Sequence, residues 1–117
     1  MNPSPKLEVV FYKTEQGNEP VREWLKDLPK ADKKTIGEDI KTVQFGWPIG
    51  MPLVGNLGHG IWEVRIKLNN NRIARILFFM DDHTMVLVHG FIKKTQKTPP
   101  EEFDLARKRK KLYMPKE

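Results

Sequence analysis

The stretch that decides the fold is residues 61–80, IWEVRIKLNNNRIARILFFM. Its first eight residues alternate apolar with charged side chains, and the charged face carries Glu63, Arg65 and Lys67. A period of two predicts a strand with one buried and one polar face. Three asparagines follow, a residue type that tolerates the positive φ of a tight turn. The apolar second half should therefore return as an antiparallel strand.

The sequence on both sides of this hairpin extends the sheet and adds helices. Residues 7–12 are short, β-branched and aromatic, as a first strand requires, and residues 84–92 read as a third hairpin strand. Helical periodicity predicts helices over residues 21–28 and 30–45, whereas the Pro, Gly and Asn content of residues 47–60 is typical of a loop. We expect an α+β fold of order β-α-α-β-β-β-α, with two N-terminal helices packed on a mainly antiparallel four-stranded sheet.

A last helix is predicted over residues 99–115, and it is strongly basic. Thr98 can cap its start, Pro99 suits its first position, and Glu101 can close a capping box. Its apolar stripe is narrow and is surrounded by the basic run at 107–111.

The composition indicates one basic domain spanning residues 1–117, with residues 1–6 as a flexible leader. The chain has 38% hydrophobic residues and a formal net charge of +6, so it can bury a core and still attract polyanions. The same charge also fits a basic protein with no polyanion partner. Because there is no cysteine, no signal-peptide pattern and no apolar run long enough for a bilayer, we expect a cytoplasmic protein with no membrane partner.

One arginine is conspicuous because it interrupts an apolar strand. Burying the guanidinium of Arg75 in such a strand costs free energy unless an anion pairs with it. One interpretation is a structural ion pair with Glu63 across the sheet. The other is an anion site that Arg75 forms with Arg65 and the lysines beyond His89, which are Lys93, Lys94 and Lys97.

The remaining candidates each have a plain structural alternative. The lysines at the strand end also suit a solvated sheet edge, and His89 fits a hydrogen-bonded core residue better than a general base. Asp81, Asp82 and His83 lack metal-ligand spacing and read as a turn, so no metal site is predicted.

Three motifs resemble the RelE/HigB toxin superfamily, and more narrowly its phage-derived HigB-like branch. They are GIWEVR at 60–65, RILF at 75–78 and HGFIKKTQKTP at 89–99. The resemblance runs from about Leu7 to Lys111 and implies a RelE/ParE-like fold.

The resemblance further implies the toxin of a type II toxin–antitoxin system. Such a protein cuts messenger RNA on the ribosome without a metal or other cofactor, and a cognate helix-turn-helix antitoxin neutralises it. By position in the motifs, the catalytic residues would be Arg65, Arg75, Lys93 and Lys94. We expect further RNA contacts from five more cations, namely Lys67, Arg72, Lys97, Arg107 and Lys108.

Two departures from the family pattern bear on the chemistry. Ala74 stands where many members have a tyrosine, and Tyr113 is the only late tyrosine. Lys93 could serve as an acid or base if neighbouring cations depress its pKa. The alternative function is a non-cleaving basic binding protein, either a ParE-like gyrase inhibitor or a phage regulatory protein, because the fold alone does not fix the target.

Overall fold

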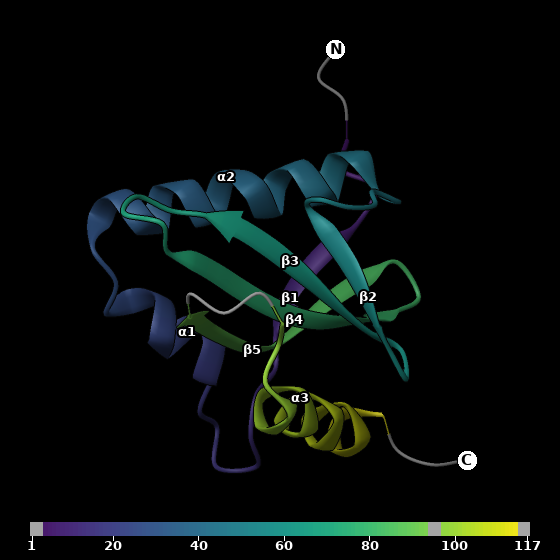
Figure 1. The fold of residues 1–117 in the computed structure, drawn as a ribbon. Coiled ribbons are helices and arrows are strands. Elements are labelled where there is room, and N and C mark those ends of the chain that lie inside the picture. The colour runs from purple at the N-terminus through teal and green to yellow at the C-terminus, as the bar shows by residue number, and fades with distance from the viewer. Residues whose placement is uncertain (1–3, 94–96, 115–117) are drawn as a thin grey trace.

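The computed structural model describes residues 4–93 and 97–114, which form five strands and three helices (Figure 1). The expected mixed α+β class is confirmed. In chain order the elements are β1 (Glu8–Phe11), α1 (Pro20–Lys26), α2 (Lys30–Gly46), β2 (Val54–Gly58), β3 (Ile61–Lys67), β4 (Ile73–Asp81), β5 (Thr84–Lys93) and α3 (Pro100–Tyr113).

The prediction of four strands was wrong, because the segment expected to be a loop contains β2. Val54 pairs with Val64 and Gly55 with Glu63, and the register shifts between Asn56 and Gly58. Glycine and asparagine disfavour a strand on their own, but pairing with β3 supplies the hydrogen bonds that override this preference. The sheet order is β1-β5-β4-β3-β2, with β1 parallel to β5 and the other neighbours antiparallel.

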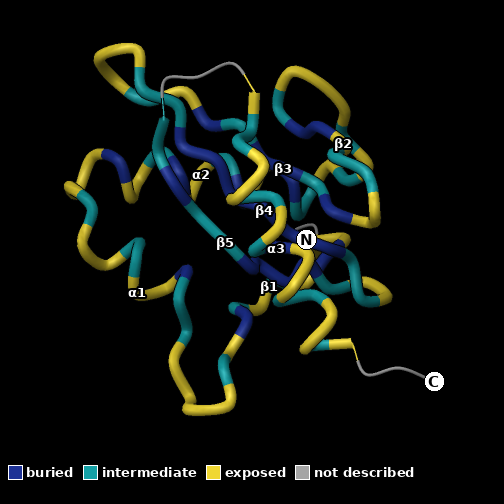
Figure 2. The backbone as a smooth tube through the Cα atoms, turned by 60° about the horizontal axis from the view of Figure 1, so that its bottom comes forward, coloured by how far each residue is buried: buried dark blue, intermediate teal, exposed yellow. Residues whose placement is uncertain are grey.

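The helices cover the two faces of this sheet unequally. α1 and α2 lie on one face and α3 lies on the other, so the sheet forms the middle layer (Figures 1 and 2). On the first face, Ile36 and Val43 of α2 join a core with Val64, Ile76 and Phe78. A smaller core under α3 is built from its Ala106, from Tyr12 and from six buried residues of the strands, namely Ile61, Leu77, Phe79, Val86, Val88 and Phe91.

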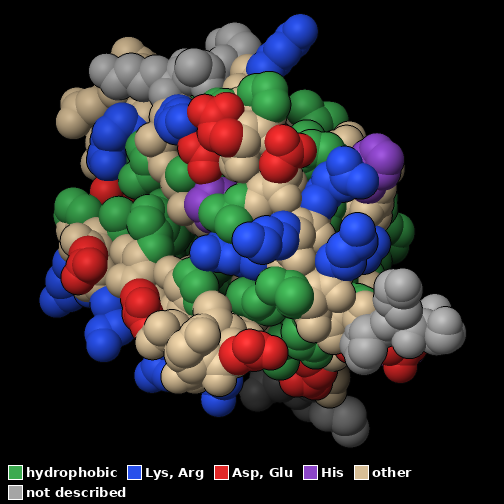
Figure 3. All heavy atoms as spheres, turned by 90° about the horizontal axis from the view of Figure 1, so that it is seen from below, with side chains coloured by type: hydrophobic (Ala, Val, Ile, Leu, Met, Phe, Trp, Pro, Cys, Tyr) green, Lys and Arg blue, Asp and Glu red, His purple; other side chains and the backbone are tan. Residues whose placement is uncertain are grey.

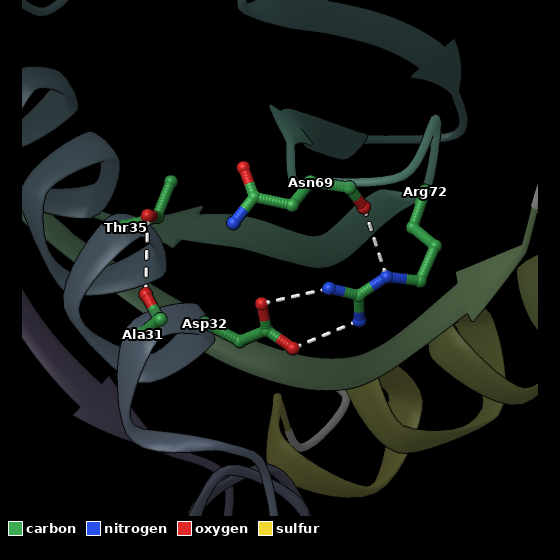
Figure 4. A network of polar contacts seen from close by, with 5 residues as sticks. All are labelled: Ala31, Asp32, Thr35, Asn69 and Arg72. Carbon is green, nitrogen blue, oxygen red and sulfur yellow. Dashed lines mark hydrogen bonds and ion pairs between the residues drawn. The ribbon is translucent and has the colours of Figure 1, made fainter.

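The turn between β3 and β4 is fastened to α2 by a buried carboxylate. Asn70 and Asn71 adopt positive φ values of 65° and 60°, which confirms the predicted asparagine turn. The guanidinium of Arg72 donates two hydrogen bonds to Asp32, of 2.8 and 3.0 Å, and its Nε donates to the Asn69 carbonyl (Figure 4). Arg72 was expected to contact RNA, but this bidentate pair commits its guanidinium to the fold.

The two ends of the chain differ in part from expectation. Residues 1–3 of the predicted flexible leader lie outside the described residues, whereas the amide of Lys6 donates to the Gln44 carbonyl at 2.8 Å. The predicted capping box is wrong, because α3 starts at Pro100 after an N-cap at Pro99 and has no side-chain cap. In the described part of the chain, no helix combines the length and apolar character that crossing a membrane requires.

Candidate functional site

The face of the sheet under α3 collects the charged side chains that the sequence pattern singled out. Arg65 lies directly opposite Arg75, and Arg75 lies opposite Phe91. Residues paired in this way point to the same side of a sheet. Two residues further along each strand, Lys67, Ile73 and Lys93 form the next row on this face, and two residues in the other direction Glu63, Leu77 and His89 form another. Strand alternation therefore placed these cations on one face correctly.

Arg75 is fully buried, and it lies against the carboxylate of Glu63. Its Nε is 3.9 Å from Glu63 Oε1, so the cross-strand ion pair left open by the sequence is present. A second nitrogen, Nη1, donates to the Lys97 carbonyl at 3.2 Å. Burial lowers the pKa of Arg75, Glu63 opposes this shift and Arg65 adds to it. A guanidinium remains protonated regardless, so Arg75 acts as a fixed internal cation.

The segment before α3 is fastened over this buried pair. The Thr98 hydroxyl donates to Glu63 Oε1, the same oxygen that faces Arg75. Thr98 is thus used to dock the segment rather than to cap the helix. Together with the hydrogen bond from Arg75 to the Lys97 carbonyl, this contact holds the segment in place over Arg75.

A solvent-accessible pocket lies beside the buried pair, between strands β2 and β3 and the start of α3. It has a volume of about 580 Å³. Arg65, half-buried, and the exposed Lys97 supply its positive charge, and Glu63 of the buried pair supplies a carboxylate. Met51, Leu57 and Phe103 supply apolar walls. A pocket of this size with a few polar groups on apolar walls is typical of small-ligand and nucleotide sites. We refer to this pocket as the Arg65 pocket.

A second polar cluster joins β5 to the first turn of α3. His89 Nε2 lies 2.5 Å from Glu102 Oε1, and Lys93 Nζ lies 2.8 Å from Glu102 Oε2. Burial alone would raise the pKa of Glu102, but the hydrogen bonds from His89 and Lys93 and their charges leave it lowered. His89 is hydrogen-bonded, as its position in the strand suggested, but it is half-buried and not part of the core.

The condition under which Lys93 could serve as an acid or base, a pKa depressed by neighbouring cations, is not met. The hydrogen bond to Glu102 raises that pKa, because an ammonium next to a carboxylate holds its proton more firmly. Lys93 is consequently a fixed cation at neutral pH and not a proton acceptor.

The first turn of α3 therefore divides the expected cationic surface into two sites. Glu102 faces β5, where it holds Lys93 and His89, whereas Phe103 lines the pocket that contains Arg65 and Lys97. Arg75 is buried beneath the segment before α3, and Lys94 lies outside the described residues. The sequence offered no signal for Glu102 as a partner of two β5 residues, because it is one of several acids at a helix start.

The other predicted RNA-binding residues lie on exposed surfaces. Lys67 is exposed at the end of β3, and Arg107 and Lys108 are exposed on α3. Figure 3, which looks onto the α3 side, shows Lys and Arg side chains gathered beside a smaller group of Asp and Glu side chains. Acidic residues occupy the first turn of α3 and basic residues its last turn, an order that the helix dipole favours.

No three His, Asp or Glu side chains come together as a metal site within residues 4–93 and 97–114. Tyr113 lies far along α3, where its ring packs against Phe79 at 5.3 Å between centroids. Burial and the Asp81 carboxylate raise the pKa of Tyr113.

The fold and site define a small basic α+β domain with a cationic pocket at the edge of its sheet. Residues 23–111 match the family described as phage-derived protein Gp49-like, and the chain belongs to that family. No curated protein matches the sequence significantly.

Proposed function

We propose that this protein is the toxin of a type II toxin–antitoxin system and cleaves messenger RNA on the ribosome. The observation that supports the proposal is the Arg65 pocket, in which two cations and the carboxylate of Glu63, which is paired with Arg75, lie beside apolar and aromatic walls in a member of a phage-derived family. The resemblance of its motifs to the RelE/HigB superfamily, in the HigB-like branch, supports the assignment.

The pocket suits the charge changes of RNA cleavage by the ribose 2′-hydroxyl. That hydroxyl gives up its proton to solvent and attacks the adjacent phosphorus, and the bond from phosphorus to the 5′-oxygen breaks. The leaving 5′-oxygen takes a proton from solvent, and the products are a 2′,3′-cyclic phosphate and a 5′-hydroxyl end. Negative charge grows on the phosphoryl oxygens in the transition state, where the Arg65 guanidinium can bind two of them. Phe103 offers a ring on which a neighbouring base can stack.

Buried Arg75 has a different role in this proposal from the direct phosphate contact expected from sequence. Its charge is balanced by Glu63, and it fixes Lys97 by bonding to its carbonyl. Lys93, held by Glu102, contributes a fixed charge on the other side of the first turn of α3.

The test is controlled expression in bacteria, with growth and the 5′ ends of cellular messenger RNA both recorded. The wild type should arrest growth and produce new 5′ ends. Arg65→Ala should lower cleavage by about 10²–10³-fold, the usual cost of removing one donor to a developing oxyanion. Lys34→Ala is the matched control, because it removes an exposed cation of α2 outside the pocket.

Each rival function gives a different result in the same experiment. A gyrase inhibitor arrests growth without new messenger RNA ends, and a phage regulatory protein without toxic activity leaves growth unchanged. Full cleavage by Arg65→Ala would reject the pocket as the catalytic site.

A further inference from the structure

A second pocket, on the opposite side of the sheet, has no role in the proposed catalysis. It has a volume of about 340 Å³ and lies between α1, α2 and the edge strand β1. Its apolar lining comes from Val9, Phe11 and Leu25, which are half-buried, and from three buried residues, namely Ile36, Ile40 and Leu87. We call it the β1 groove.

The charged residues at the rim of the β1 groove are cationic. Arg22, Lys26 and Lys33 line it, and among residues 4–93 and 97–114 no acidic residue does. Arg22 pairs with Glu19 at 3.1 Å, but Lys26 and Lys33 form no ion pair with any residue that the structure describes. Apolar walls with a positive rim complement an apolar segment flanked by acidic side chains.

Gly37 is the observation that indicates how closely an occupant approaches. It lies inside α2, where glycine weakens a helix, and it lines the β1 groove. A Cβ built at Gly37 would meet nothing within 4 Å, so packing within this chain does not require a glycine here. A glycine facing an open groove permits another backbone to come into contact with the helix.

We propose that the β1 groove binds an amphipathic helix of a protein partner, with acidic residues beside its apolar stripe. A helix fits because Gly37 allows close helix–helix contact, and a short helix presents apolar anchors at i, i+3 or i+4 and i+7. A second copy of this chain is disfavoured, because its net charge of +6 and its own positive rim would be repelled. If the proposed function holds, this partner is the antitoxin, and it binds on the face opposite the Arg65 pocket.

The test uses a phage-displayed library of helical peptides selected against the purified full chain. Peptides that bind are then measured against two variants. Gly37→Leu places a side chain in the groove at a position where its Cβ meets nothing within 4 Å, and Thr42→Leu adds the same leucine to an exposed position of α2 outside the groove. We expect acidic, amphipathic peptides whose affinity falls at least about tenfold, or 1.4 kcal/mol, in Gly37→Leu and is unchanged in Thr42→Leu.

Charge reversal tests the rim separately. Lys26→Glu with Lys33→Glu should weaken the same peptides, whereas Lys34→Glu with Lys41→Glu, an equal charge change outside the groove, should leave them bound. Three results would each overturn the proposal: peptides that bind Gly37→Leu normally, no preference for acidic peptides, or a wild-type dimer that Gly37→Leu converts to monomer.

The outcome is independent of the ribonuclease assignment. Gly37→Leu should retain any growth arrest and messenger RNA cleavage that the wild type shows, because the groove and the Arg65 pocket lie on opposite faces of the sheet. Loss of peptide binding with cleavage intact supports the groove. Peptide binding in a protein that never cleaves RNA rejects the catalytic proposal alone.

Discussion

Arg75 and Glu63 form a buried ion pair whose contribution to the stability of the fold depends on both members being present. Breaking such a pair leaves one charge buried without compensation, whereas replacing both members with apolar residues is often neutral. Here the Glu63 carboxylate also accepts from Thr98, so it organises the start of α3 as well as the sheet. The arginine that interrupts the apolar strand is therefore a structural residue first.

We predict that Arg75→Met destabilises the protein by about 3–5 kcal/mol, because the Glu63 carboxylate stays buried without its guanidinium. Urea unfolding followed by circular dichroism measures this. The double variant Arg75→Met with Glu63→Leu should recover most of the lost free energy of unfolding. A single variant as stable as the wild type would show that the ion pair does not hold the fold together.

Asp32 gives the fold an acid-sensitive contact. The hydrogen bond from Arg72 lowers its pKa, although burial opposes this shift. A depressed carboxylate pKa stabilises the folded state above the unfolded value, about 3.9, and this contribution is lost as the pH falls through the lower, folded value.

We therefore predict that the unfolding free energy of the wild type falls more steeply below about pH 5 than that of Asp32→Asn. The amide cannot lose stability by protonation, although the variant is less stable at neutral pH. Urea midpoints measured from pH 3 to 7 provide the comparison. Parallel curves for the two proteins would show that Asp32 is not held ionised by Arg72.

At the scale of elements, two glycines have opposite environments. Gly90 of β5 lies against Trp24 of α1, where an added Cβ would come within 2.6 Å of the indole ring. This contact fixes the distance at which α1 packs on the sheet. Gly37 of α2, in contrast, faces open space.

Alanine at these two positions should consequently change stability in opposite directions. Gly90→Ala should cost about 1–3 kcal/mol through overpacking, and Gly37→Ala should add about 0.5–1 kcal/mol through helix propensity. Thermal unfolding of both variants beside the wild type checks the signs. Destabilisation by Gly37→Ala would mean that α2 already needs the glycine for its own packing.

An element could be predicted from the sequence when the interactions that stabilise it join residues close together in the chain. The asparagine turn, the alternating strand β3 and the helix α2 follow from residues close in sequence, and all three were anticipated. β2 was missed because its glycines and asparagine are held in a strand by β3. The cap of α3 was misassigned because Thr98 bonds Glu63, a residue 35 positions away.

The same distinction applies to the candidate site across the whole molecule. Strand alternation placed Arg65, Arg75 and Lys93 on one face, because that depends only on a period of two. The solvent exposure of these three residues depends on how the segment before α3 and the first turn of α3 lie across the sheet. That arrangement is set by tertiary contacts. The pattern therefore identified the face but not its division into a pocket, a buried pair and the Glu102 cluster.

The basic outer face of α3 provides a test of how the whole molecule uses its charge. Each phosphate contact on single-stranded RNA contributes about 0.7 to the slope of log affinity against log salt. If Arg107 and Lys108 each contact a phosphate, the double variant Arg107→Ala with Lys108→Ala should lower that slope by about 1.4. Lys34→Ala with Lys41→Ala removes the same charge from exposed positions on α2, on the opposite side of the sheet, and should leave the slope near the wild-type value.

Fluorescence anisotropy with a labelled RNA oligonucleotide across a salt series gives the three slopes. Equal slopes for the two double variants would mean that the protein attracts RNA through net charge alone, without a binding surface on α3.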